Sequence, residues 1–178
     1  MTIASNGHGR TLVVLVRDNP GVLTRVAGLF RRRNFNIESL VVGHSETPGV
    51  SRMTVVVAGG AAEVDQVVKQ LLKLVEVLEV RDVSDGSPLL REMVLIRVGA
   101  DASQRTEVTE LAKLFSARII DVSHGSITLE MTGAETKVDN LVRLLSKFGI
   151  REMVRSGRIA MARDMSDYPV ETVEALSA

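Results

Sequence analysis

The chain has 178 residues and equal numbers of basic and acidic side chains, 22 of each, so its formal net charge is +0. This balance argues against a strongly basic nucleic-acid-binding protein and against an acidic disordered chain. Cysteine is absent, which excludes disulfides, thiolate metal sites and a cysteine nucleophile. Aromatic residues make up 3 %, which disfavours a base-stacking platform. The length suits one ordinary domain or two small ones.

The sequence contains no sign of export or of membrane insertion. Residues 1–10 lack the apolar segment of a secretory signal. No apolar run approaches the ~20 residues that a membrane-spanning helix requires. We therefore expect a cytoplasmic protein that binds neither a membrane nor nucleic acid.

The first half of the chain alternates between strand and helix patterns. Thr11–Arg17 is a nearly continuous apolar, β-branched run, which is typical of a buried strand. The next apolar residues are spaced i, i+3, i+4 and i+7, which predicts a helix with one apolar face. That face consists of Leu23, Val26, Ala27 and Phe30. After it come strands at 35–45 and 51–58, a second helix with the stripe Val64, Val67, Val68 and Leu71, and a strand at 75–83.

The same order of patterns returns after residues 85–90, which we interpret as a linker. After the linker, strand patterns lie at 92–98, 118–122, 126–132 and 150–162, and the last of them is interrupted near Ser156-Gly157. A helix is predicted between the first two strands by the stripe Val108, Leu111, Ala112 and Phe115. A second helix is predicted before the last strand by the stripe Val138, Leu141, Val142 and Leu145. Each half thus has the order βαββαβ. This order predicts an α+β protein with two tandem ferredoxin-like domains, at residues 11–84 and 91–163.

Domains of this kind have a reason to associate. Each predicted domain has about 75 residues, a size at which one hydrophobic core is marginal. A βαββαβ domain carries both helices on one face of its sheet, which leaves the other face and the sheet edges open. We therefore expect an obligate oligomer, a homodimer built by sheet extension.

Two charged segments have more than one interpretation. Arg31-Arg32-Arg33 is either a solvated helix end that complements the helix dipole or a protein-docking patch. Residues 164–178 form an acidic tail without a basic side chain. This tail is either a disordered terminus or carries a partner-docked helix over residues 170–176.

The sequence offers few groups for catalysis. It contains no nucleophile elbow, no HExxH zinc motif and no P-loop lysine motif. The three histidines, His8, His44 and His124, are far apart, and the last two lie beside predicted turns that we expect them to serve. We therefore expect no catalytic site and no metal site on this chain.

The segment Asp18–Leu23 is the strongest candidate for a binding site, because it lies where a strand ends and a helix begins. The first N–H groups of a helix favour a carboxylate, and Asp18 can accept an ammonium group, so the segment suits a free amino acid. In a sheet-extended dimer, Asn36 can add a donor and an acceptor from the partner chain. The alternative is purely local: Asp18 and Asn19 cap the helix, Pro20-Gly21 shapes the turn, and Asn36 bonds nearby backbone.

Several motifs carry a resemblance to a known family. Asp18-Asn19-Pro20-Gly21-Val22-Leu23, followed by residues 25–30 (RVAGLF), resembles the ligand loop and first helix of an ACT domain. Further motifs, in family order between residues 11 and 163, resemble the small regulatory subunit of acetolactate synthase (acetohydroxyacid synthase). These motifs are residues 35–40 (FNIESL), 51–54 (SRMT), 69–75 (KQLLKLV), 91–93 (REM), 120–122 (IDV) and 155–157 (RSG).

The resemblance implies a role that spacing alone does not predict. In that family a separate large subunit performs catalysis with thiamine diphosphate, magnesium and FAD. It condenses two pyruvates, or pyruvate with 2-oxobutyrate, at the start of branched-chain amino-acid biosynthesis, which includes isoleucine. The small subunit, which needs no cofactor of its own, activates the large subunit and confers feedback inhibition by valine.

The resemblance also implies an effector site between two ACT domains of a homodimer. The matching positions are Asp18, Asn19, Pro20, Gly21, Val22 and Leu23 of one chain, with Asn36 and Ile37 of the other. Asp18 departs from many related subunits, which carry Asn there. A carboxylate suits an effector ammonium group but repels a misplaced effector carboxylate. The alternative function is an ACT-type amino-acid sensor that acts on another enzyme or regulator.

Overall fold

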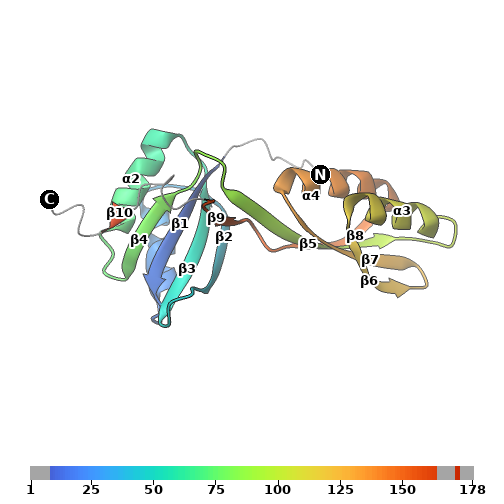
Figure 1. Ribbon diagram of the computed structural model, residues 1–178, viewed down its shortest axis with the longest axis horizontal. Helices are drawn as coiled ribbons and strands as arrows, with labels where there is room; N and C mark the ends of the chain where they lie inside the picture. Colours follow the sequence, from blue (N-terminus) through green and yellow to red (C-terminus); the bar gives the residue numbers. More distant parts are fainter. Residues whose placement is uncertain (1–8, 164–170, 173–178) are drawn as a thin grey trace. The chain divides into compact units, whose positions relative to one another are not determined.

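The computed structural model describes residues 9–163 and 171–172, which form two compact units (Figure 1). Of the described residues, the first unit contains 9–89, 160–163 and 171–172, and the second consists of Leu90–Ile159. Each unit has one antiparallel sheet and two α-helices in the order βαββαβ. The prediction of two tandem ferredoxin-like domains is therefore confirmed.

The first unit carries the candidate binding loop. Its elements are β1 (Arg10–Arg17), α1 (Val22–Arg32), β2 (Ile37–His44), β3 (Val50–Val57), α2 (Ala61–Leu71) and β4 (Val77–Asp82). The sheet order is β4-β1-β3-β2, and the two-residue strand β10 (Glu171–Thr172) adds beside β4. Within the described part of the chain, β2 is therefore an edge strand with no partner on its outer side.

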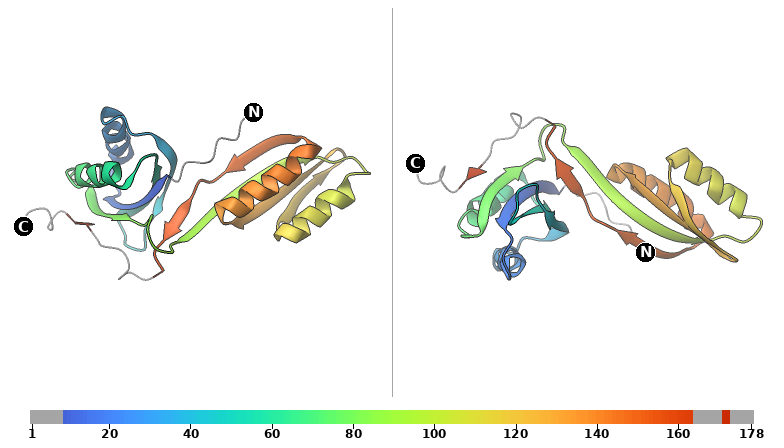
Figure 2. Two further views of the ribbon diagram at one scale, coloured as in Figure 1. Left: turned by 90° about the horizontal axis from the view of Figure 1, so that it is seen from above. Right: turned by 60° about the horizontal axis from the view of Figure 1, so that its bottom comes forward.

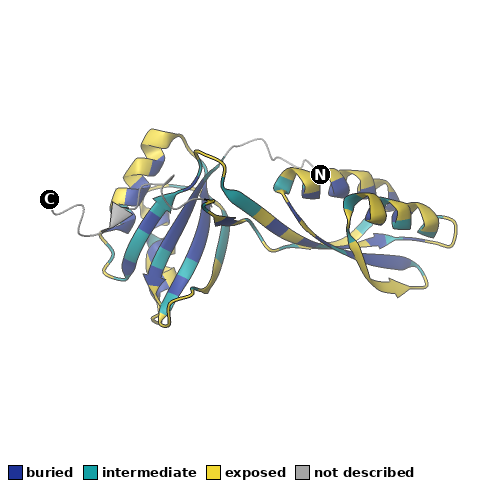
Figure 3. Ribbon diagram, in the orientation of Figure 1, coloured by how far each residue is buried: buried dark blue, intermediate teal, exposed yellow. Residues whose placement is uncertain are grey.

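The core of the first unit lies between its helices and one face of the sheet (Figures 2 and 3). The four stripe residues of α2 are all buried, as predicted. The predicted face of α1 is partly wrong, because Leu23 is 46 % exposed and Ala27 is also exposed. Two overlapping sets of residues in α1 have helical spacing, and the set that packs into the core is not the one that we predicted. Its members are Val22, Val26, Leu29 and Phe30.

The second unit repeats the architecture with its own core. Its elements are β5 (Leu89–Gly99), α3 (Arg105–Phe115), β6 (Arg118–Ser123), β7 (Ser126–Gly133), α4 (Glu135–Leu145), the 3-10 helix η1 (Ser146–Phe148) and β8 (Ile150–Arg155). The sheet order is β6-β7-β5-β8. A further short strand, β9 (Ile159–Met161), begins at the last residue of this unit and continues into the first unit. Because β5 begins at Leu89, the last two residues of the expected linker 85–90 belong to a strand.

The carboxyl-terminal end of the described part extends beyond these repeats. Of the acidic tail expected at 164–178, only Glu171 and Thr172 are described, and there the backbone is a strand rather than the helix considered for 170–176. The remaining tail residues lie outside the described part. No helix in residues 9–163 or 171–172 is long and apolar enough to cross a membrane.

Candidate functional site

The candidate loop joins β1 to α1 at one end of the first sheet. The backbone N–H of Asp18 donates to the carbonyl of Gly49 at 2.8 Å, and that of Asn19 donates to the carbonyl of Arg17 at 2.9 Å. Gly21 has φ +84°, in the left-handed region that favours glycine. These features turn the chain sharply and leave residues 18–21 exposed.

The amino-terminal end of α1 has unused donors. The N–H of Val22 reaches the carbonyl of Asn19 at 3.3 Å. The N–H groups of Leu23 and Thr24 meet no side-chain or carbonyl acceptor within the described residues, and the first turn contains no acidic residue. Such a helix end carries partial positive charge, so it favours a carboxylate.

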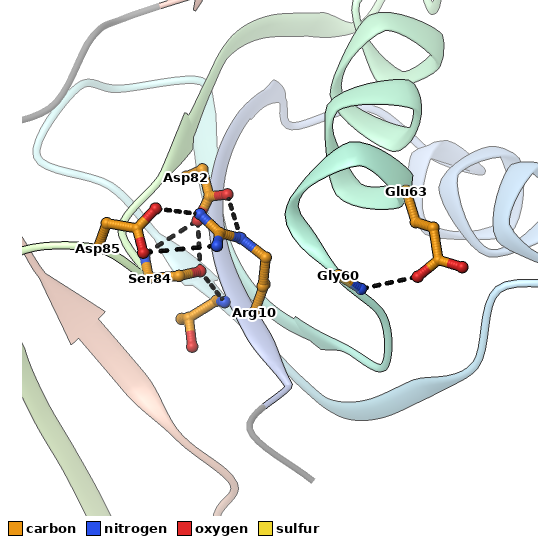
Figure 4. Close-up of polar contacts among 7 residues, drawn as sticks. Arg10, Gly60, Glu63, Asp82, Ser84 and Asp85 are labelled. Carbon is orange, nitrogen blue, oxygen red and sulfur yellow. Dashed lines mark hydrogen bonds and ion pairs between the residues drawn. The ribbon is translucent and has the colours of Figure 1, made fainter.

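The beginning of α2 is different. There the Glu63 carboxylate reaches back and accepts the N–H of Gly60 at 2.7 Å (Figure 4). No comparable contact is made at α1, where neither Asp18 nor Asn19 bonds a helical N–H through its side chain. The interpretation in which these two residues cap α1 is therefore wrong. Their side chains are left available to other partners.

Of the charged side chains around the loop, Arg25 is engaged in an ion pair, whereas the carboxylate of Asp18 remains accessible. Arg25 on α1 is paired with Glu76, with Nη1 and Oε1 2.9 Å apart. The Asp18 carboxylate is half-exposed and lies 3.5 Å from Nδ1 of His44, at the end of β2. The corner thus combines helix N–H donors with an accessible carboxylate. This combination complements the carboxylate and the ammonium group of a zwitterion.

Two neighbouring apolar residues have different positions. Val22 is 4 % exposed and belongs to the core, so it supports the loop from inside. Leu23 is exposed beside the free N–H groups. Of the two, Leu23 is therefore the residue that can offer apolar contact to a ligand at this helix end.

Asn36 and Ile37 lie at the opposite end of the same sheet. Arg17, next to the loop, pairs with Val50 at the start of β3, whereas Ile37 pairs with Val57 at its end. The carbonyl of Asn36 accepts the N–H of Ala58 at 3.1 Å, and its side chain is exposed at the beginning of the edge strand β2. A single chain therefore does not bring the two predicted halves of the site together.

His44 is the site residue that sequence reasoning missed, since we expected it to serve a turn. The available signal was its place at the end of a strand, which brings it to the same end of the sheet as Asp18. His124 lies in the β6–β7 turn, and its carbonyl accepts Nη2 of Arg105 at 2.7 Å. No group of three or more His, Asp or Glu within the described ranges is arranged to hold a metal ion.

Comparisons with known proteins cover both units. A model of the "AHAS small subunit-like ACT domain" matches residues 12–79, and a model of the "Small subunit of acetolactate synthase" matches residues 91–164. An Archaeoglobus fulgidus protein named "Probable acetolactate synthase small subunit" is 51 % identical over 153 residues, which are 86 % of this chain and 96 % of that protein. The acetolactate synthase small subunit of Mycobacterium leprae is 50 % identical over 153 residues, covering 86 % and 90 % of the two chains.

A solved structure of a small subunit resembles most of this chain. The acetolactate synthase small subunit of Thermotoga maritima superimposes with a TM-score of 0.81 at 41 % sequence identity. The match covers 87 % of this chain and 97 % of that one. It therefore extends over both units.

Proposed function

The chain belongs to the family of acetolactate synthase small subunits, and we propose that it activates a separate catalytic large subunit and makes it sensitive to valine. The complex is cytoplasmic in this proposal and serves branched-chain amino-acid biosynthesis. Thiamine diphosphate, magnesium and FAD belong to the large subunit, and this chain regulates without performing catalysis. The observation that carries the proposal is the uncapped beginning of α1 beside the Asp18 carboxylate.

The corner suits an α-amino acid with a small apolar side chain. The effector carboxylate accepts the N–H groups of Leu23 and Thr24, where the helix dipole favours negative charge. Its ammonium group donates to Asp18 in a charge-assisted hydrogen bond. The isopropyl group of valine then contacts the exposed side chain of Leu23.

A homodimer completes this site in the proposal. The edge strand β2 can pair with β2 of a second chain about a twofold axis. In such an antiparallel pair, the beginning of one strand lies beside the end of the other. Asn36 precedes β2, and His44 at its end approaches Asp18. The partner's Asn36 and Ile37 would thus reach the Asp18 corner, where Asn36 offers both a donor and an acceptor.

Binding across a dimer gives the effector a means of regulation. A ligand that contacts both chains stabilises the one relative arrangement in which both sets of contacts are made. The large subunit loses activity on effector binding if its active state requires a relative arrangement of the two small-subunit chains that differs from the one the effector stabilises. Linkage then requires that the large subunit also changes the affinity for valine.

The test is reconstitution with an acetolactate synthase large subunit. Acetolactate formation is measured for each chain alone and for the mixture, with and without valine. We expect the mixture to exceed the large subunit alone and to be inhibited by valine. An unstimulated mixture would contradict the regulatory role, and stimulation without valine inhibition would contradict the effector.

A pair of variants at Gly21 tests the site within this assay. A Cβ added at Gly21 meets nothing within 4 Å, and both Asp and Asn tolerate the left-handed backbone. Gly21→Asp places an anion where the effector carboxylate belongs, and Gly21→Asn is its uncharged control. We expect Gly21→Asp to raise the valine concentration for half-inhibition about tenfold relative to Gly21→Asn, the range of one charged hydrogen bond. Equal sensitivity of the two variants would refute the site.

A further inference from the structure

The chain passes between the two units twice. It leaves the first unit after Leu89 and returns to it at Ala160. The returning segment is attached to the first unit at two points. The carbonyl of Ala160 accepts Nη2 of Arg52 at 2.9 Å, and Nε of Arg163 donates to the carbonyl of Ser87 at 2.9 Å. The return is thus held against the unit that carries the candidate effector corner.

The same segment is firmly attached where it leaves the second unit. Arg155 donates to both carboxylate oxygens of Glu92, at 2.9 and 2.5 Å, and to Asp139 on α4 at 2.8 Å. Ser156 and Met93 exchange two hydrogen bonds, from Met93 N–H to Ser156 Oγ at 3.0 Å and from Ser156 N–H to the Met93 carbonyl at 2.9 Å. These contacts fix the end of β8 to β5.

Little chain separates the two attachments. Only Gly157, Arg158 and Ile159 lie between Ser156 and Ala160, and Arg158 is itself bonded to Glu135. A long flexible linker would absorb a displacement at Ala160. The connection between the two attachments is therefore short, and it is bonded at both of its ends.

Arg52 connects this return to the candidate effector corner. It lies on β3 opposite Leu15 of β1 and Gly43 of β2. The preceding residues of β3 reach the corner directly, because Ser51 pairs with His44 and Val50 pairs with Arg17. The Arg52 side chain is half-buried, and within the described part of the chain the Ala160 carbonyl is its one hydrogen-bond acceptor.

We infer that Arg52 is a coupling residue, which transmits occupancy of the effector corner to the second unit by holding the carbonyl of Ala160. This inference rests on the proposed function. An effector that reorders the ends of β1, β2 and β3 changes the position of Arg52 on the same strand. The Ala160 bond then converts that change into a displacement of the return segment. Arg52 does not bind the effector, so its loss uncouples inhibition from binding.

The test compares Arg52→Met with Arg143→Met in the full-length chain. Met keeps an apolar stem but donates no hydrogen bond, and Arg143 is an exposed arginine on α4 that contacts Asn140. Valine binding is measured by isothermal titration calorimetry, inhibition in the reconstituted complex, and folding by circular dichroism. We expect Arg52→Met to bind valine about as tightly as the wild type, yet to need about tenfold more valine for half-inhibition, a typical coupling effect. Arg143→Met should match the wild type in both measurements.

The other outcomes separate the inference from the function. If Arg52→Met is inhibited like the wild type, or if it loses valine binding itself, the coupling role is wrong while the proposed function stands. If the wild type is not inhibited, the proposed function fails first. Arg52→Lys keeps the charge but not the planar guanidinium, and we expect a smaller loss of inhibition. If Arg52→Met does not fold, Arg52→Lys becomes the deciding variant. In that case, inhibition of Arg52→Lys at the same valine concentration as the wild type would overturn the inference.

Discussion

The imidazole Nδ1 of His44 lies 3.5 Å from the carboxylate of Asp18, although Asp18 follows β1 and His44 is the last residue of β2. β1 ends at Arg17 and β2 ends at His44, and both strands pair with β3. The sheet therefore brings the ends of β1 and β2 together beside the start of α1. The carboxylate belongs to a corner formed by several elements rather than to an isolated turn.

Asp18→Asn tests whether this carboxylate holds the effector. The amide keeps the size of the side chain but removes the charge that attracts an ammonium group. We expect valine to bind about tenfold more weakly, as for the loss of a hydrogen bond to a charged group. Isothermal titration calorimetry of the full chain measures the change. Asp65→Asn, at an exposed carboxylate on α2 that is paired with Lys69, serves as the control. Unchanged affinity of Asp18→Asn would exclude its role.

Arg155→Met tests the attachment between β8 and β5. Glu92 is only 7 % exposed, so removal of its partner leaves a buried charge without compensation. The hydrogen bond from Arg155 to Glu92 also raises the pKa of the guanidinium above its ordinary value, so the arginine stays charged wherever the protein is studied. We expect the free energy of unfolding to fall by about 3 kcal/mol.

Urea denaturation followed by circular dichroism measures this loss. The double variant Arg155→Met/Glu92→Leu removes both charges and is expected to recover much of the stability, because an apolar pair avoids the desolvation cost. A single variant as stable as the wild type would show that the buried carboxylate does not depend on Arg155.

The Asp101 carboxylate, which lies just before α3, should make the stability of the fold depend on pH. Its carboxylate accepts hydrogen bonds from Ser103 Oγ at 2.6 Å and from the N–H groups of Ser103 and Gln104, and these bonds lower the pKa of Asp101. A lowered carboxyl pKa stabilises the fold above the unfolded value of 3.8, and this stabilisation is lost as the pH falls through the folded value. Asp101→Ala should therefore be less stable than the wild type at neutral pH, with a difference that shrinks in acid. Thermal unfolding across pH measures it, and a difference that grows on acidification would contradict the assignment.

The sequence predicts some parts of this structure better than others, for physical reasons. The stripe of α2 is unambiguous because one set of valines and a leucine has helical spacing. In α1 two sets overlap, and the choice of Val22 over Leu23 depends on packing. The binding loop is visible in its turn residues. The bond from Arg52 to Ala160 joins residues 108 positions apart, so local patterns do not reveal it.

The sharing of one effector site by two chains is the central claim, and a mixed dimer tests it most directly. Gly21→Asp damages the loop and Asn36→Ala damages the contribution of the partner, so each homodimer should bind valine weakly. A heterodimer of the two variants, purified through two different tags, contains one undamaged site formed by the Asn36→Ala chain's loop and the Gly21→Asp chain's Asn36. We predict that calorimetry will find one valine bound per heterodimer with wild-type affinity. A heterodimer that binds no better than its parents would contradict a site shared between chains.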